Sequence, residues 1–150
     1  MLMPDANVLL YAVNADSDHH EEAKRWLDAV LGNPVPIGFT WVVLLAFLRI
    51  TTRAGIFPHP LTVEQATDAV DGWLSQPAAM IVSATPRQMG ALRGLLEKSG
   101  TGGNLVTDAH LATLALEHDA QIITYDGDFG RFPGVRHGRP TAPPADDDGK

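Results

Sequence analysis

The sequence predicts a single α/β domain in which helices cover both faces of a central parallel sheet. Short apolar stretches that end in turn residues alternate along the chain with longer segments whose apolar residues recur at helical spacing. Strands that are separated by helices pair in parallel, and a parallel sheet is covered on both faces. A length of 150 residues is that of one ordinary domain with its own core.

The first part of the chain is predicted to form a strand and two helices. Residues 1–4 form a short strand that ends at Asp5, and residues 8–13 form a helix just after it. Residues 19–31 carry an apolar helical face, and two glutamates suit the first turn of this helix because of its dipole. The residues of this face are Ala23, Trp26, Leu27, Val30 and Leu31.

The middle of the chain is predicted to add one strand and two helices. Residues 34–40 hold a short strand, and residues 41–53 form a strongly apolar helix that ends before Gly55 and Pro58. Residues 62–75 form an amphipathic helix. Its first residue is a threonine with a glutamine three positions on, which is the spacing of a capping box.

The last part of the chain continues the alternation. Residues 80–83 form a strand, and residues 86–98 a helix with a proline near its first turn. Residues 107–118 form a helix, residues 121–125 a β-branched strand, and a further short strand is expected near Val135. The apolar face of the later helix consists of Leu111, Ala112, Leu114 and Ala115.

The folded domain is expected to span residues 1–139, followed by a tail of residues 140–150. This tail is rich in proline and aspartate and has no large apolar residue, so it is predicted to be disordered and solvated. A tail that binds a basic partner is the alternative.

The composition narrows the classes of function. The absence of cysteine excludes disulfides and thiolate sites, and it suits a reducing cytoplasm. The longest apolar run, residues 41–48, is far shorter than the roughly 20 residues that span a bilayer. We therefore expect a soluble cytoplasmic protein with no membrane partner. The net charge of −7 argues at first sight against a nucleic-acid partner, but acids held in a metal site or a tail would account for part of it.

Aspartates stand at the ends of three predicted elements. Asp5 ends the first strand, Asp126 and Asp128 follow the strand of residues 121–125, and Asp108 lies in the first turn of a late helix. Ligand sites of parallel sheets form outside the carboxyl ends of the strands. Each aspartate alone would be explained as a turn or cap residue. Together, and beside apolar segments, they predict one shared site.

Such a cluster of carboxylates would either raise its own pKa values or require a cation. Two carboxylates about 5 Å apart repel by roughly 3 kcal/mol at an effective dielectric constant near 20, which raises their pKa values unless a cation binds. Oxygen ligands select Mg²⁺ or Mn²⁺ over zinc. These ions activate water and stabilise the charge of an in-line phosphoryl displacement. The predicted chemistry is metal-assisted hydrolysis of a phosphodiester.

The sequence resembles the PIN-domain family, and more narrowly its VapC-type toxins. The resemblance runs from about Met3 to Pro140 and is carried by three segments in this order: PDANVLLYAVN, WVVLLAFLRITT and GNLVTDAHLATLALEHDAQIITYDGDFGRFPGV. It implies helices around a central parallel sheet and a Mg²⁺ or Mn²⁺ site made of acids. It also implies an endoribonuclease that cleaves structured RNA, tRNA or ribosomal RNA, forms a homodimer, and is neutralised by a VapB-type antitoxin.

The resemblance also implies roles for individual residues. Asp5, Asp108 and Asp126 match the catalytic, metal-binding acids of the family, and Asp128 is close enough in sequence to be a further ligand. Asn7 occupies a polar position of the family motif, where it would orient a carboxylate or a water molecule.

One position departs from the family pattern. Many members carry a glutamate in the second motif where this chain has Ala46. A single metal, a second metal completed by Asp128 or by the RNA phosphate, and weakened catalysis all remain open. Arg49 lies three residues later on nearly the same helix face, where it would clamp a phosphate or pair with an acid.

Two classes of function remain at this stage. The first is the metal-dependent ribonuclease toxin, and the alternative is a catalytically weakened PIN-fold module that binds RNA or protein. A phosphoacceptor receiver domain fits poorly, because a lone aspartate follows the first strand and no late strand ends in lysine.

Overall fold

A computed structural model describes residues 1–100 and 102–141 of the chain. Within these residues, five short strands form one sheet in the order β3-β2-β1-β4-β5, and all neighbouring strands are parallel. The strands are β1 (Leu2–Pro4), β2 (Ile37–Phe39), β3 (Ala79–Ile81), β4 (Gln121–Ile123) and β5 (His137–Gly138). The predicted parallel α/β fold is confirmed.

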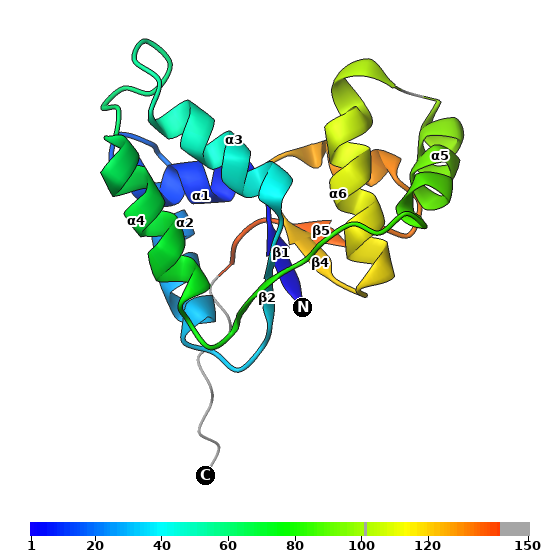
Figure 1. Ribbon diagram of the computed structural model, residues 1–150, viewed down its shortest axis with the longest axis horizontal. Helices are drawn as coiled ribbons and strands as arrows, with labels where there is room; N and C mark the ends of the chain where they lie inside the picture. The colour runs from blue at the N-terminus through cyan, green and yellow to red at the C-terminus, as the bar shows by residue number, and fades with distance from the viewer. Residues whose placement is uncertain (101, 142–150) are drawn as a thin grey trace.

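Helices cover both faces of this sheet. Helices α1 to α4 lie on one side of the strands, and α5 and α6 lie on the other (Figure 1). They are α1 (Ala6–Val13), α2 (His20–Leu31), α3 (Trp41–Thr51), α4 (Val63–Leu74), α5 (Gln88–Ser99) and α6 (Val106–Glu117), with 3-10 helices η1 (Gly103–Leu105) and η2 (Gly127–Arg131). None of the helices in the described ranges is long and apolar enough to cross a membrane.

The predicted elements are all present, with ends displaced by a few residues. Helix α1 begins at Ala6 rather than residue 8, because the Asp5 side chain caps it by accepting a hydrogen bond from the Ala6 N–H at 2.8 Å. The last strand follows Val135 instead of containing it, because Gly134, with φ +79°, first turns the chain. The expected tail lies outside the described residues from residue 142 onward.

The capping box predicted at the start of α4 is confirmed. The Thr62 hydroxyl accepts a hydrogen bond from the Gln65 N–H at 3.0 Å, and the Gln65 side chain accepts one from the Thr62 N–H at 3.0 Å. Two backbone donors that the helix leaves unpaired are thereby satisfied.

The strand order determines where along the sheet a ligand site can form. The chain proceeds from β1 outward through β2 and β3, then returns to the other side of β1 for β4 and β5. Pro4 and Ile123, the last residues of β1 and β4, are partners across this reversal, and the Asp5 N–H bonds to the Ile123 carbonyl at 2.9 Å. Ligand sites of open parallel sheets form at such a switch point. Residues that follow β1 and β4 therefore emerge next to one another.

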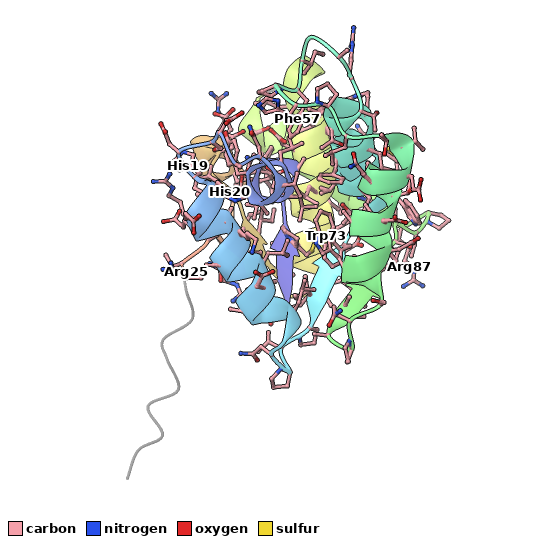
Figure 2. All side chains as sticks on the ribbon, turned by 90° about the vertical axis from the view of Figure 1, so that its left-hand side faces the viewer. His19, His20, Arg25, Phe57, Trp73 and Arg87 are labelled. Atoms are coloured by element: carbon pink, nitrogen blue, oxygen red, sulfur yellow. The ribbon has the colours of Figure 1, made fainter. Side chains whose placement is uncertain are left out.

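The core holds the flanking helices against the sheet. Trp73 of α4 points inward toward the sheet (Figure 2), and its ring stacks on Phe39 of β2 at 6.3 Å and meets Phe47 of α3 at 4.9 Å between centroids. Helix α6 is buried around most of its circumference, through Ala109, Leu111, Ala112, Thr113, Leu114 and Ala115. Asp108, in the first turn of this helix, directly precedes these buried residues.

Replacing Gly38 in the buried strand β2 with alanine is expected to lower the free energy of unfolding by about 2 kcal/mol. The added Cβ would lie 2.7 Å from Val82 Cγ2 and 2.9 Å from Met1 Sδ, so these packed side chains would have to shift. Urea unfolding measures the change. The matched variant Gly72→Ala, at an open position of α4, should instead stabilise the protein by about 0.5–1 kcal/mol. Equal effects of the two substitutions would contradict this packing.

Candidate metal centre

Three carboxylates converge beyond the carboxyl edge of the sheet. Asp108, Asp126 and Asp128 each offer an oxygen atom, and these oxygens all lie within 4.8 Å of one another. Asp108 comes from the first turn of α6, and the other two come from η2 and the residue that precedes it. Three of the predicted acids, from segments far apart in sequence, thus form one cluster.

A local turn positions Asp126 and Asp128. Asp126 is the N-cap of η2, and its side chain accepts a hydrogen bond from the Asp128 N–H at 2.9 Å. Phe129, fully buried against the ring of Phe132, anchors the turn in the core. Arg131 lies 3.7 Å from Asp128 in an exposed pair, which contributes little to stability.

Asp5 lies beside this cluster in a more enclosed position. Its Oδ1 accepts the N–H of Ala6, and its Oδ2 accepts the hydroxyl of Thr124 at 2.9 Å and the amide of Asn7 at 3.4 Å. Asp5 and Asp108 line the same small cavity. The structure therefore places all four predicted acids at one edge, with Asp5 adjoining the group of three.

Thr124, which the sequence analysis did not single out, joins the two strand ends. Its buried hydroxyl donates to Asp5 and accepts from the Asn7 amide at 3.1 Å and from the Asp126 N–H at 3.0 Å. Asn7 completes the connection by accepting the Tyr125 N–H at 3.1 Å. The available signal was a hydroxyl two residues before an aspartate at the end of an apolar strand.

Ring contacts support the same loop from outside. The Tyr125 hydroxyl donates to Glu22 at 2.7 Å, and its ring stacks with His19 at 4.3 Å and meets Tyr11 edge-on at 5.2 Å. The Arg139 guanidinium lies over the same ring at 4.8 Å. Burial, followed by the bond to Glu22, raises the pKa of Tyr125, so this hydroxyl stays protonated and remains a donor.

Burial and nearby carboxylates raise the pKa values of Asp108 and Asp5. Burial, followed by the charges of Asp5, Asp126 and Asp128, raises the pKa of Asp108 to about 6. Burial also raises the pKa of Asp5, against the opposing effect of its hydrogen bonds from Thr124 and Ala6. A set of oxygen donors that repel one another in this way fits a hard divalent cation such as Mg²⁺ or Mn²⁺.

Metal-free protein is expected to lose stability as the pH rises from 5 to 8. The pKa of Asp108 is raised from 3.8 in the unfolded chain to about 6 in the folded protein. The stability that the protonated Asp108 contributes is therefore fully present below about pH 4 and is lost as the pH rises through 6. Urea unfolding in chelator at both pH values measures this. Millimolar Mg²⁺ should reverse the loss at pH 8. A Mg²⁺ effect equal at both pH values would contradict it.

Ala46 and Arg49 lie on α3 next to these carboxylates. Ala46 lines the small cavity together with Asp5 and Asp108 and supplies no carboxylate. Arg49 is exposed and makes no ion pair with any of the described residues. It lines a larger neighbouring groove.

The parallel sheet and the acids at its switch point are the features of a PIN domain. A family model described as "PIN domain" matches residues 2–135, so the chain belongs to the PIN-domain family. Within this family the chain is similar to VapC ribonucleases. It is 53% identical over 142 residues to Ribonuclease VapC37 of Mycobacterium tuberculosis, covering 95% of this chain and 99% of that protein. Ribonuclease VapC33 of the same species is 40% identical over 136 residues, or 91% of this chain and 95% of the relative.

Solved structures agree on the fold. VapBC2 of Rickettsia felis, bound to a DNA fragment from its promoter, superposes with a TM-score of 0.66 at 24% identity, covering 92% of this chain and 97% of that chain. VapC20 of Mycobacterium tuberculosis, described as a sarcin–ricin loop cleaving toxin, superposes with a TM-score of 0.64 at 20% identity, covering 91% and 99%. At these identities the likeness shows the fold alone.

Proposed function

We propose that this protein is a metal-dependent endoribonuclease, the toxin of a VapBC pair, and that it cleaves structured RNA such as tRNA or ribosomal RNA. The observation that carries the proposal is the cluster of Asp108, Asp126 and Asp128, with Asp5 beside it, at the switch point of a PIN domain. The relatives named ribonucleases support the same activity, and the described target of VapC20 supports a structured RNA.

Asp108, Asp126 and Asp128 would hold Mg²⁺ or Mn²⁺ in this mechanism. A bound ion supplies activation of water and neutralisation of charge on the phosphodiester. Asp5 adds a fourth negative charge beside the cluster, and the Thr124 hydroxyl holds this carboxylate in place. Without a bound cation, these acids would repel the phosphate of an RNA, and the protein's net charge of −7 would add to that repulsion.

The test is incubation of the purified protein with total RNA in Mg²⁺, in Mn²⁺ and in chelator, with mapping of the cut ends. We expect discrete cuts that require the metal. RNA that is retained but never cut would favour the alternative, a weakened PIN-fold module that only binds RNA or protein. In that case calorimetry with Mn²⁺ would show whether the acids bind a metal at all.

We propose that this protein binds a VapB-type antitoxin and that both proteins act in the cytoplasm. Several structural neighbours are VapBC complexes, including those of Rickettsia felis and Salmonella typhimurium. The expected results are growth arrest on expression, relief on coexpression with a small DNA-binding protein, and a gene for that protein next to this one. Harmless expression from an isolated gene would contradict the pairing.

A homodimer is part of the same proposal. Trp41 is 51% exposed and Val63 is 70% exposed, and apolar side chains of this kind gain from burial against a second copy. Sedimentation at micromolar concentration is expected to show twice the chain mass. A monomer at all concentrations would remove this part of the proposal and leave the enzymatic part intact.

A further inference from the structure

A groove on the surface of α3 opens beside the carboxylates. It is open to solvent, has a volume of about 510 Å³, and is lined by Val42, Leu45, Ala46 and Arg49 of α3 and by Thr107 of α6. These two helices flank the carboxyl edge of the sheet from opposite sides (Figure 1). The volume lies within the range of ligand pockets, roughly 300–1,000 Å³.

This groove adjoins the candidate metal centre. A smaller cavity of about 80 Å³ shares Val42, Ala46 and Thr107 with it and is also lined by Asp5 and Asp108. Ala46 therefore borders both spaces. A longer side chain at position 46 would occupy space in both, which the short alanine side chain leaves free.

The groove combines features that suit a nucleotide. Val42 and Leu45 provide apolar walls for the flat face of a base or for a ribose, and the Thr107 hydroxyl can donate or accept a hydrogen bond. Arg49 carries a positive charge at the same groove and has no ion-pair partner among the described residues. A guanidinium in this state is available to a phosphate.

We propose that this groove binds the nucleoside next to the cleaved phosphodiester, with Ala46 making room for it and Arg49 contacting its phosphate. The inference deepens the proposed ribonuclease function and rests on it. A nucleotide is the occupant that the surroundings favour, because the groove opens toward a cation-binding cluster on one side and holds a free cationic side chain. A protein side chain would satisfy the apolar walls but would leave Arg49 without an anion.

The experiment is a methyl and amide NMR titration of the full chain in Mg²⁺. The probes are the four 5′-nucleoside monophosphates and, separately, inorganic phosphate. We expect nucleotides to shift the signals of Val42, Ala46 and Thr107, and inorganic phosphate to leave these three signals unchanged. Preference among the four bases would identify the nucleoside that the groove selects.

Two variants and a matched control test the residues. Ala46→Leu, which fills the groove, should weaken nucleotide binding at least tenfold, and Arg49→Ala should weaken it about tenfold through loss of the charged contact. Ala29→Leu makes the same substitution on an exposed position of α2 and should leave the affinity unchanged. Thermal unfolding verifies that each variant is folded. If Ala46→Leu does not fold, the nucleotide affinity of Arg49→Ala alone tests the inference.

Three results would overturn the inference. The first is wild-type affinity in both Ala46→Leu and Arg49→Ala. The second is an identical response of the three signals to inorganic phosphate. The third is a change of oligomeric state in Ala46→Leu with unchanged nucleotide affinity, which would assign the groove to a protein partner.

The RNA cleavage assay distinguishes failure of this inference from failure of the proposed function. Metal-dependent RNA cleavage without nucleotide binding in the groove would refute the groove alone. Absence of cleavage by the wild-type protein would refute the ribonuclease, whatever the groove binds.

Discussion

The Asp108→Asn variant is expected to cleave RNA about a hundredfold more slowly than the wild type, or slower still, in the presence of metal. It removes one of the three clustered carboxylates. The same variant should be more stable than the wild type in chelator at pH 8. Burial and the charges of Asp5, Asp126 and Asp128 raise the pKa of Asp108 to about 6, so ionisation at pH 8 costs folding free energy that asparagine avoids. After allowance for solvent screening, the gain is about 1 kcal/mol.

These opposite changes separate a site residue from a structural one. RNA cleavage in Mn²⁺ and urea unfolding in chelator measure them on the same preparation. The control is Asp28→Asn on α2, where the aspartate is exposed and pairs with Lys24 at 3.3 Å. It should change neither quantity appreciably. If the Asp108→Asn variant cuts RNA at the wild-type rate, Asp108 does not belong to the catalytic site. If this variant is less stable than the wild type in chelator, ionisation of Asp108 does not cost folding free energy.

The Thr124→Val variant is expected to lose about 2 kcal/mol of unfolding free energy and about 10–100-fold of activity. Valine keeps the shape of the buried side chain but cannot donate to Asp5 or accept from Asn7 and the Asp126 N–H. These polar groups would lie part-buried without that partner, and the two strand ends would lose their connection.

Two further variants distinguish this positioning role from a general loss of stability. Thr124→Ser retains the hydroxyl and should recover most of the activity, although it removes a buried methyl group. Thr51→Val is the matched control, because Thr51 is also fully buried and donates to the Phe47 carbonyl at 2.8 Å. It should lower stability without lowering the cleavage rate of folded protein. Equal activity of the valine and serine variants at position 124 would show that the hydroxyl does not position the site.

Local patterns in the sequence determined the elements and the chemistry of the acids. Each helix and strand has a run of residues with its own period, and these runs predict a parallel sheet without any knowledge of contacts. The capping box at Thr62 and Gln65 is predictable because its partners are three residues apart. Asp5, Asp126 and Asp108 are recognisable because each follows or opens an apolar element. Periodicity and local hydrogen bonding need no tertiary information.

Only the tertiary structure decided which element ends meet and what lies between them. Strand order is set by the packing of helices on the two faces of the sheet, and this order brings β4 beside β1 and thus Thr124 beside Asp5, which are 119 positions apart. The same packing places Ala46 and Arg49 of α3 at a groove shared with α6. Contacts across such sequence distances depend on the sum of many weak packing interactions, and no local pattern encodes them.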